Sequence, residues 1–256
     1  MTKVSARFSS LGTLAVALLS TGTAMAAPIT FAQYFQSNGN TQQWTVSVSG
    51  STTTVSATGS VVFQFSGVPG VPFSGPENAI FTLNATSTQV GNCGVSCGPG
   101  DSFVQPGYSG TFSFIDNGAA PGANLLSGTF AVTGSPSTTG AQFSSSIGGT
   151  GGSFNASATA GNLNQLVFTS AYLNFANQVN EDASWSLSSL IPNFAVDTIT
   201  ANQARPAAAT PFHAAGTGTF SSNPGPTAAP EPATFGIIGA ALLGLSLKAR
   251  KRFART

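Results

Sequence analysis

The segment WTVSVSGSTTTVSATGSVVFQF, residues 44–65, alternates apolar side chains with serine and threonine along most of its length. A period of two is typical of a β-strand that has one apolar face and one polar face. The same alternation returns in Phe81–Leu83, Phe112–Phe114 and Trp185–Leu187. The polar face of each predicted strand carries hydroxyl groups in place of charges.

Less regular strands are expected between turn signals such as Gly67–Gly70, Gly98–Gly100 and Gly148–Gly152. They cover residues 51–57, 125–132, 142–147, 154–159, 165–169, 194–199 and 212–220. Helical periodicity is absent from the body, although Phe31–Phe35 could form one helical turn. Ten or more short strands favour an all-β body over residues 27–220. The expected fold is an antiparallel β-sandwich, jelly-roll-like in its topology.

Charged residues make up only 6% of the 256 residues, against roughly 25% in ordinary soluble domains. The chain nevertheless has 20 phenylalanines, enough aromatic side chains to form a core and to exclude general disorder. Between Ala27 and Ala229, one arginine against six acidic residues gives a formal charge of −5. This balance excludes binding to nucleic-acid phosphates.

The first 26 residues have the pattern of a secretory signal peptide. Lys3 and Arg7 precede an apolar run over Leu11–Leu19, and Ala24-Met25-Ala26 is a small-x-small cleavage site. The apolar run is too short to cross a bilayer as a helix, which disfavours a membrane anchor. We therefore expect the general secretion machinery to export the chain and signal peptidase to cut it between Ala26 and Ala27.

The other end of the chain has three ordered parts after a polar linker at residues 221–229. Pro230-Glu231-Pro232 comes first, an apolar run at 234–247 follows, and a basic tail fills 248–256. As a helix the apolar run spans about 21 Å, a short crossing that snorkelling lysine and arginine side chains can extend. The basic tail would stay cytoplasmic by the positive-inside rule.

This tail resembles the PEP-CTERM sorting signal, and the resemblance covers about residues 230–256. It implies a Gram-negative source and processing near the Pro230-Glu231-Pro232 triplet by an exosortase, a membrane-embedded protease-transpeptidase. It also implies transient anchoring in the inner membrane by the C-terminal helix, followed by delivery to the cell surface or extracellular matrix. The tail determines where the protein is delivered, and it does not identify the function of the body.

Cys93 and Cys97 are the only two cysteines. In an exported protein, such an isolated pair predicts a disulfide, here closing a glycine-rich loop, with free thiols as the alternative. A zinc site would need two further ligands, and His213 is the one strong candidate. We expect no metal and no cofactor, although Asp101, Asp116 and Asp182 leave calcium binding as an alternative.

No complete catalytic set is apparent. Gly94-Val95-Ser96-Cys97-Gly98 matches G-x-S-x-G, but no helix is predicted to follow it, as a nucleophile elbow requires. His213 is the only histidine, and it is expected at a surface or strand edge. Glu181 and Asp182 are adjacent, so in a strand they would face opposite sides and not form one site.

The sequence therefore predicts a non-catalytic surface or matrix protein associated with exopolysaccharide or biofilm. The alternative is a carbohydrate-binding module in which exposed Tyr34, Tyr108 or Tyr172 stacks on sugar rings. A secreted hydrolase is less favoured. An ice-binding protein is also less favoured, because the chain lacks regular Thr-x-Thr arrays and Thr52-Thr53-Thr54 is isolated.

Overall fold

A computed structural model describes residues 27–37, 42–73, 75–94, 96–131, 141–158 and 165–229. These residues form strands joined by turns, and no helix among them is long and apolar enough to cross a bilayer. The predicted signal peptide, sorting triplet, apolar run and basic tail lie outside the described residues, as does Ala26. The strands are β1 (Ile29–Gln36), β2 (Trp44–Ser49), β3 (Thr52–Phe65), β4 (Glu77–Ser87), β5 (Gly91–Asn92), β6 (Ser102–Asp116), β7 (Asn124–Phe130), β8 (Ala141–Ser146), β9 (Gly152–Ala158), β10 (Leu166–Thr169), β11 (Leu173–Asn174), β12 (Asn180–Ile191), β13 (Val196–Thr200), β14 (Gln203–Pro206), β15 (Phe212–Asn223) and β16 (Thr227–Ala228).

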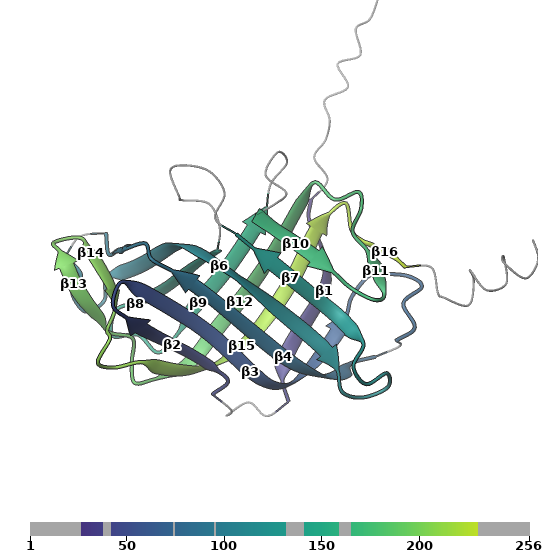
Figure 1. Cartoon of the computed structure of the whole chain (residues 1–256), viewed down its shortest axis with the longest axis horizontal. Helices are drawn as coiled ribbons and strands as arrows, with labels where there is room; N and C mark the ends of the chain where they lie inside the picture. Colours follow the sequence, from purple (N-terminus) through teal and green to yellow (C-terminus); the bar gives the residue numbers. More distant parts are fainter. Residues whose placement is uncertain are drawn as a thin grey trace, which may run out of the picture.

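The main sheet closes on itself. Following its hydrogen-bonded neighbours leads from β1 through β3, β4, β6, β8, β9, β12 and β15 and back to β1, with every pairing antiparallel. The body is thus an eight-stranded barrel with tilted strands (Figure 1). The all-β, antiparallel part of the expectation is confirmed, whereas the two-sheet sandwich is wrong.

Closure depends on pairing between the two ends of the body. Strand β1 pairs with β3 through Ala32–Gln36 and with β15 through Ile29–Tyr34. Beyond the part of β3 and β15 that β1 occupies, strand β2 lies between the same two strands and pairs with both. The predicted helical turn at Phe31–Phe35 is therefore wrong, because these residues form the strand that closes the sheet.

Two long strands explain why separate sheets do not form. Strand β3 joins the expected strand at residues 51–57 to the alternating residues 61–65, and Gly59 lies between them. Strand β6 is longer still: along one edge its first half pairs with β8 and its second half with β7. Because these strands are continuous, the hydrogen bonding between neighbouring strands continues around the body. A sandwich would need this hydrogen bonding to be interrupted between its two sheets.

Aromatic rings fill the barrel. Trp44 of β2 contacts Phe81 of β4, Phe154 of β9 and Trp185 of β12, so rings meet from several sides of the circuit. Phe81 and Phe114 stack with centroids 4.7 Å apart. The largest side chains that are fully buried are Trp44, Trp185, Tyr34, Tyr108, Phe31, Phe63, Phe81, Phe103, Phe114, Phe130, Phe143 and Phe154. The interior is therefore a packed core.

Glycines opposite these rings provide the space that they need. The phrase Gly-Thr-Phe occurs in β6, β7 and β15. In β15, Gly218 pairs with Tyr34 on one side and with Trp185 on the other. An added Cβ at Gly218 would lie 2.6 Å from Tyr34 Cε1 and 2.9 Å from Trp185 Cδ1. The glycine is thus a packing requirement of the core.

Gly218→Ala should lower the free energy of unfolding by about 1–3 kcal/mol, because the methyl group overlaps two fully buried rings. Urea unfolding monitored by tryptophan fluorescence measures the change. Gly75→Ala is the matched control, since a Cβ there meets nothing within 4 Å, and its effect should stay within about 0.5 kcal/mol. Equal destabilisation by the two variants would contradict the packing role.

The segment after residue 220 packs on the body. Strand β15 continues to Asn223, and β16 pairs with β11. The Ala229 N–H donates to the Tyr172 carbonyl at 2.7 Å. Residues 221–229, expected as a polar linker, are therefore part of the folded body, because antiparallel pairing continues almost to the sorting triplet.

Candidate functional site

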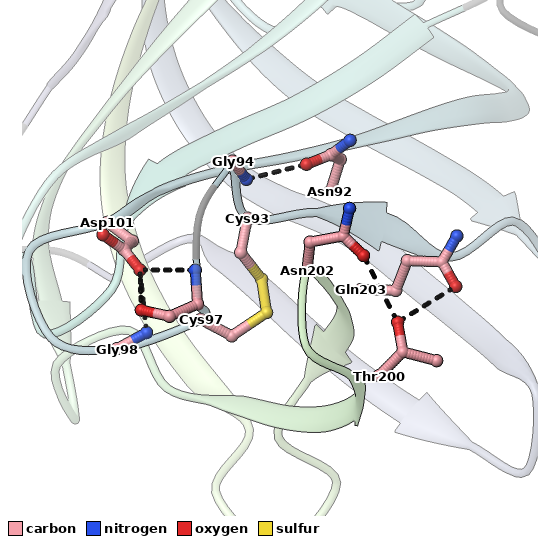
Figure 2. The surroundings of a disulfide bond; sticks show 10 residues. Asn92, Cys93, Gly94, Cys97, Gly98, Asp101, Thr200, Asn202 and Gln203 are labelled. Carbon is pink, nitrogen blue, oxygen red and sulfur yellow. Dashed lines mark hydrogen bonds between the residues drawn. A yellow bond between two sulfur atoms is a disulfide. The ribbon is translucent and has the colours of Figure 1, made fainter.

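The disulfide loop lies next to the β13–β14 hairpin, at the opposite end of the body from β11 and β16 (Figure 1). Cys93 and Cys97 form a disulfide, and both cysteines are buried (Figure 2). The Cys93 N–H donates to the Asn202 carbonyl in the turn between β13 and β14. The disulfide thus closes a loop that contacts a strand pair distant in sequence.

The Asp101 carboxylate also stabilises this loop by accepting hydrogen bonds from it. Its Oδ2 atom accepts the Gly98 N–H at 2.9 Å (Figure 2). The same oxygen accepts the Ser96 hydroxyl at 3.0 Å and the Ser96 N–H at 3.3 Å. The Gly98 N–H, followed by the Ser96 hydroxyl, holds the pKa of Asp101 below its usual range. Ser96 is therefore a loop-stabilising donor at an exposed turn.

The intact exported protein, measured without reductant, should weigh less than the thiol form by two hydrogens. The double variant Cys93→Ser/Cys97→Ser should lose no more than about 2 kcal/mol of unfolding free energy, because the disulfide closes a very short loop. Mass spectrometry and urea unfolding measure the two effects. An unshifted mass would show that the thiols stay free outside the cell.

The other residues singled out from the sequence are dispersed. His213 is exposed at the start of β15, where its Nδ1 lies 3.0 Å from the Thr45 hydroxyl oxygen. Asp116 is buried, and its carboxylate accepts the N–H groups of Gly118 and Ala120 in the turn before β7. Within the described ranges, no three metal-ligating side chains come together.

The tyrosines do not form a sugar-stacking platform. Tyr34 and Tyr108 are fully buried, so their predicted exposure is wrong. The Tyr108 hydroxyl donates to Gln105 Oε1 at 2.7 Å. Tyr172 packs edge-on against Phe73, with ring centroids 4.7 Å apart. Alternation alone could not show which face of these strands points into the barrel. The Tyr34 and Tyr108 rings lie on the face that does.

A broad uncharged surface covers the outside of β3, β4, β6, β7 and β10. Its side chains lie in cross-strand rows set by the register of the strands. One row is Thr58, Thr82, Ser113, Ser127 and Thr169, a second is Ser56, Asn84, Thr111 and Thr129, and a third is Thr54, Thr86 and Ser109. We call these twelve residues the hydroxyl face. All are exposed or half-exposed, and none is charged.

A shallow hollow of about 300 Å³ lies within the hydroxyl face. Hydroxyl groups from β4, β6, β7 and β10 line it, among them Thr82, Thr111, Thr129 and Thr169, together with the exposed Val167. The Thr82 and Ser113 hydroxyl oxygens lie 2.7 Å apart. This array could not be identified from the sequence, because consecutive members of a row are distant along the chain.

A second hollow contains a buried carboxylate. Glu181 lies on the inner side of β12 and is 7% exposed, whereas neighbouring Asp182 is on the outer side. The predicted opposite orientation of this pair is confirmed. Burial raises the pKa of Glu181 to about 7, although the Phe168 N–H donates to its carboxylate and offsets part of the rise.

The unfolding free energy should therefore fall as the pH rises from about 4.5 to 7. In this range the unfolded chain releases the Glu181 proton while the folded chain retains it. Glu181→Gln removes this contribution, while that of Asp182, whose pKa burial also raises, remains. The variant should be more stable than the wild type by about 2–3 kcal/mol at pH 8. The two should be equal near pH 4. Urea unfolding across this range measures the difference, and a gap that does not change with pH would contradict it.

Comparison with known proteins adds one result. The model of the PEP-CTERM protein-sorting motif matches residues 228–252. No curated protein and no solved structure matches the chain. The match confirms the suspected sorting signal, and it begins within β16, directly beside the folded body.

Proposed function

We propose that the chain is a non-catalytic protein of the cell surface or extracellular matrix, and that its body associates with neutral exopolysaccharide. The sorting motif at residues 228–252 supports the proposed location, because this motif indicates an exported protein processed by an exosortase. Signal peptidase and the general secretion machinery would act before the exosortase. The chain would be anchored in the inner membrane only until that processing.

The hydroxyl face supports the second part. Neutral polysaccharides present hydroxyl groups repeatedly along a chain, and rows of serine, threonine and asparagine can donate to and accept from them at many points. Each such hydrogen bond contributes little on its own, because it replaces a bond to water. An extended face therefore suits a matrix role, in which a long polymer makes many weak contacts.

The test is co-sedimentation of the full chain, purified in detergent, with exopolysaccharide from the producing strain. Thr111→Lys places a charge within the hydroxyl face and should weaken retention several-fold. Thr198→Lys, on exposed β13, is the matched control and should bind as the wild type does. Retention should also be nearly independent of salt between 0.05 and 0.5 M, in contrast to binding between charged groups. Equal retention of both variants would refute the role of the hydroxyl face.

The hollow favours one alternative, a carbohydrate-binding module that holds a short saccharide at a discrete site. Its volume of about 300 Å³ limits the bound part to one or two sugar units. Saturable binding of an oligosaccharide, lost in Thr111→Lys, would favour this alternative. Binding only of long polymer would favour the matrix role.

A further inference from the structure

The hollow that contains Glu181 lies at a seam, where strands β10 and β12 come together without pairing with each other. Strand β10 pairs with β7 along one edge only, while β12 pairs with β9 and β15. Between β10, β11 and the start of β12 is an open hollow of about 500 Å³, which we call the seam cavity. Phe168, Leu173, Phe175, Ala176 and Ala229 provide most of its apolar walls. The last of these residues directly follows β16, so the C-terminal end of the body completes the cavity.

Glu181 is the only charged residue among those that line this cavity. The body has few basic side chains to neutralise it. Arg205 donates to the Thr88 carbonyl, and His213 contacts Thr45 on β2. A buried carboxylate is costly to ionise unless a positive group accompanies it. Within the described part of the chain, no such group reaches Glu181.

We propose that the seam cavity binds a primary ammonium group carried on a short apolar stem. The ammonium would pair with the Glu181 carboxylate, and the stem would lie against Leu173 and Phe175. A metal ion fits less well, because one carboxylate supplies too few oxygen ligands. The same chemistry occurs in a small alkylamine and in the lysine side chain of a partner protein, so the test separates these sources.

The proposal predicts a pH dependence. No other titratable side chain lines the cavity, and Asp182 is on the opposite face of β12. Because burial raises the pKa of Glu181 to about 7, most of the carboxyl groups are protonated at pH 6 and ionised at pH 8. The apparent affinity for an ammonium should therefore be about tenfold lower at pH 6 than at pH 8.

The experiment follows the side-chain carboxyl carbons by NMR in the full chain, purified in detergent and labelled with ¹³C-glutamate. The sequence has only three glutamates, at 77, 181 and 231, and Glu181→Gln identifies the signal of interest. The probes are n-butylammonium and its neutral analogue n-butanol. Nα-acetyl-lysine amide, which presents the same group on a peptide unit, is used in parallel.

We expect n-butylammonium to shift the Glu181 signal saturably at pH 8, and n-butanol to leave it unchanged. For binding monitored by thermal unfolding, stabilisation by the amine should disappear in Glu181→Gln and persist in the control Asp182→Asn. Tighter binding of the lysine amide would indicate a partner's lysine, and tighter binding of butylammonium a free amine. Equal shifts with butanol, or undiminished stabilisation of Glu181→Gln, would overturn the proposal.

Discussion

Trp185→Ala should lower the unfolding free energy by about 3–5 kcal/mol, the largest effect expected of any single substitution considered for the body. Trp185 is fully buried, and its ring contacts those of Trp44, Phe112, Phe154 and Phe220 at centroid distances of 5.2–6.2 Å. Removing it leaves a cavity where rings from four other strands meet. Urea unfolding monitored by circular dichroism measures the loss.

Phe35→Ala is the control, because the Phe35 ring is 39% exposed on the outside of β1 and its loss should cost about 1 kcal/mol or less. If Trp185→Ala does not fold, Trp185→Phe provides the measurable variant, since it keeps one ring in the same position. Nearly equal losses at positions 185 and 35 would mean that the barrel is not filled as described.

Deletion of residues 230–256 should convert a retained protein into a freely released one. The N-terminal signal would still direct export, while the matched sorting motif would lose nearly all of its length. The folded body should survive, because the deletion spares β16 and the Ala229 N–H bond to the Tyr172 carbonyl. Immunoblots of the cell-surface and medium fractions measure the redistribution.

A second deletion, of residues 227–256, separates sorting from folding. It also removes β16 and one wall of the seam cavity, and should therefore lower the unfolding temperature as well as release the protein. Surface retention of the 230–256 deletion in a strain with an active exosortase would contradict the sorting role of the tail.

The sequence predicted the strands better than their arrangement. Alternation in residues 44–65 located β2 and both parts of β3, because the period of side chains depends only on the local backbone, but it did not show that the two parts form one strand. Whether the sheet closes depends on the pairing of β1 with both β3 and β15, and no local pattern encodes pairing between chain ends. A barrel and a sandwich with the same strands therefore have similar sequence patterns.

The candidate sites were likewise predictable where their residues are close together in the sequence, and not where the fold brings distant residues together. The sorting triplet and the cysteine pair were evident because their residues are close together in the chain. The hydroxyl face was not, since neighbours such as Thr82, Ser113 and Ser127 come from three strands. Glu181 was recognised only as one of two adjacent acids, because its burial depends on β10 and β11, which the sequence does not place beside it.

The central claim is that this body reaches the cell surface by exosortase processing, and the intact mass of the exported protein tests it most directly. Protein isolated from the surface of a producing strain should have a mass that ends near Pro230-Glu231-Pro232, without the apolar run and basic tail. In a matched strain that lacks the exosortase, the membrane fraction should contain the chain with its tail intact. A full-length tail on surface protein from the exosortase-containing strain would contradict the account.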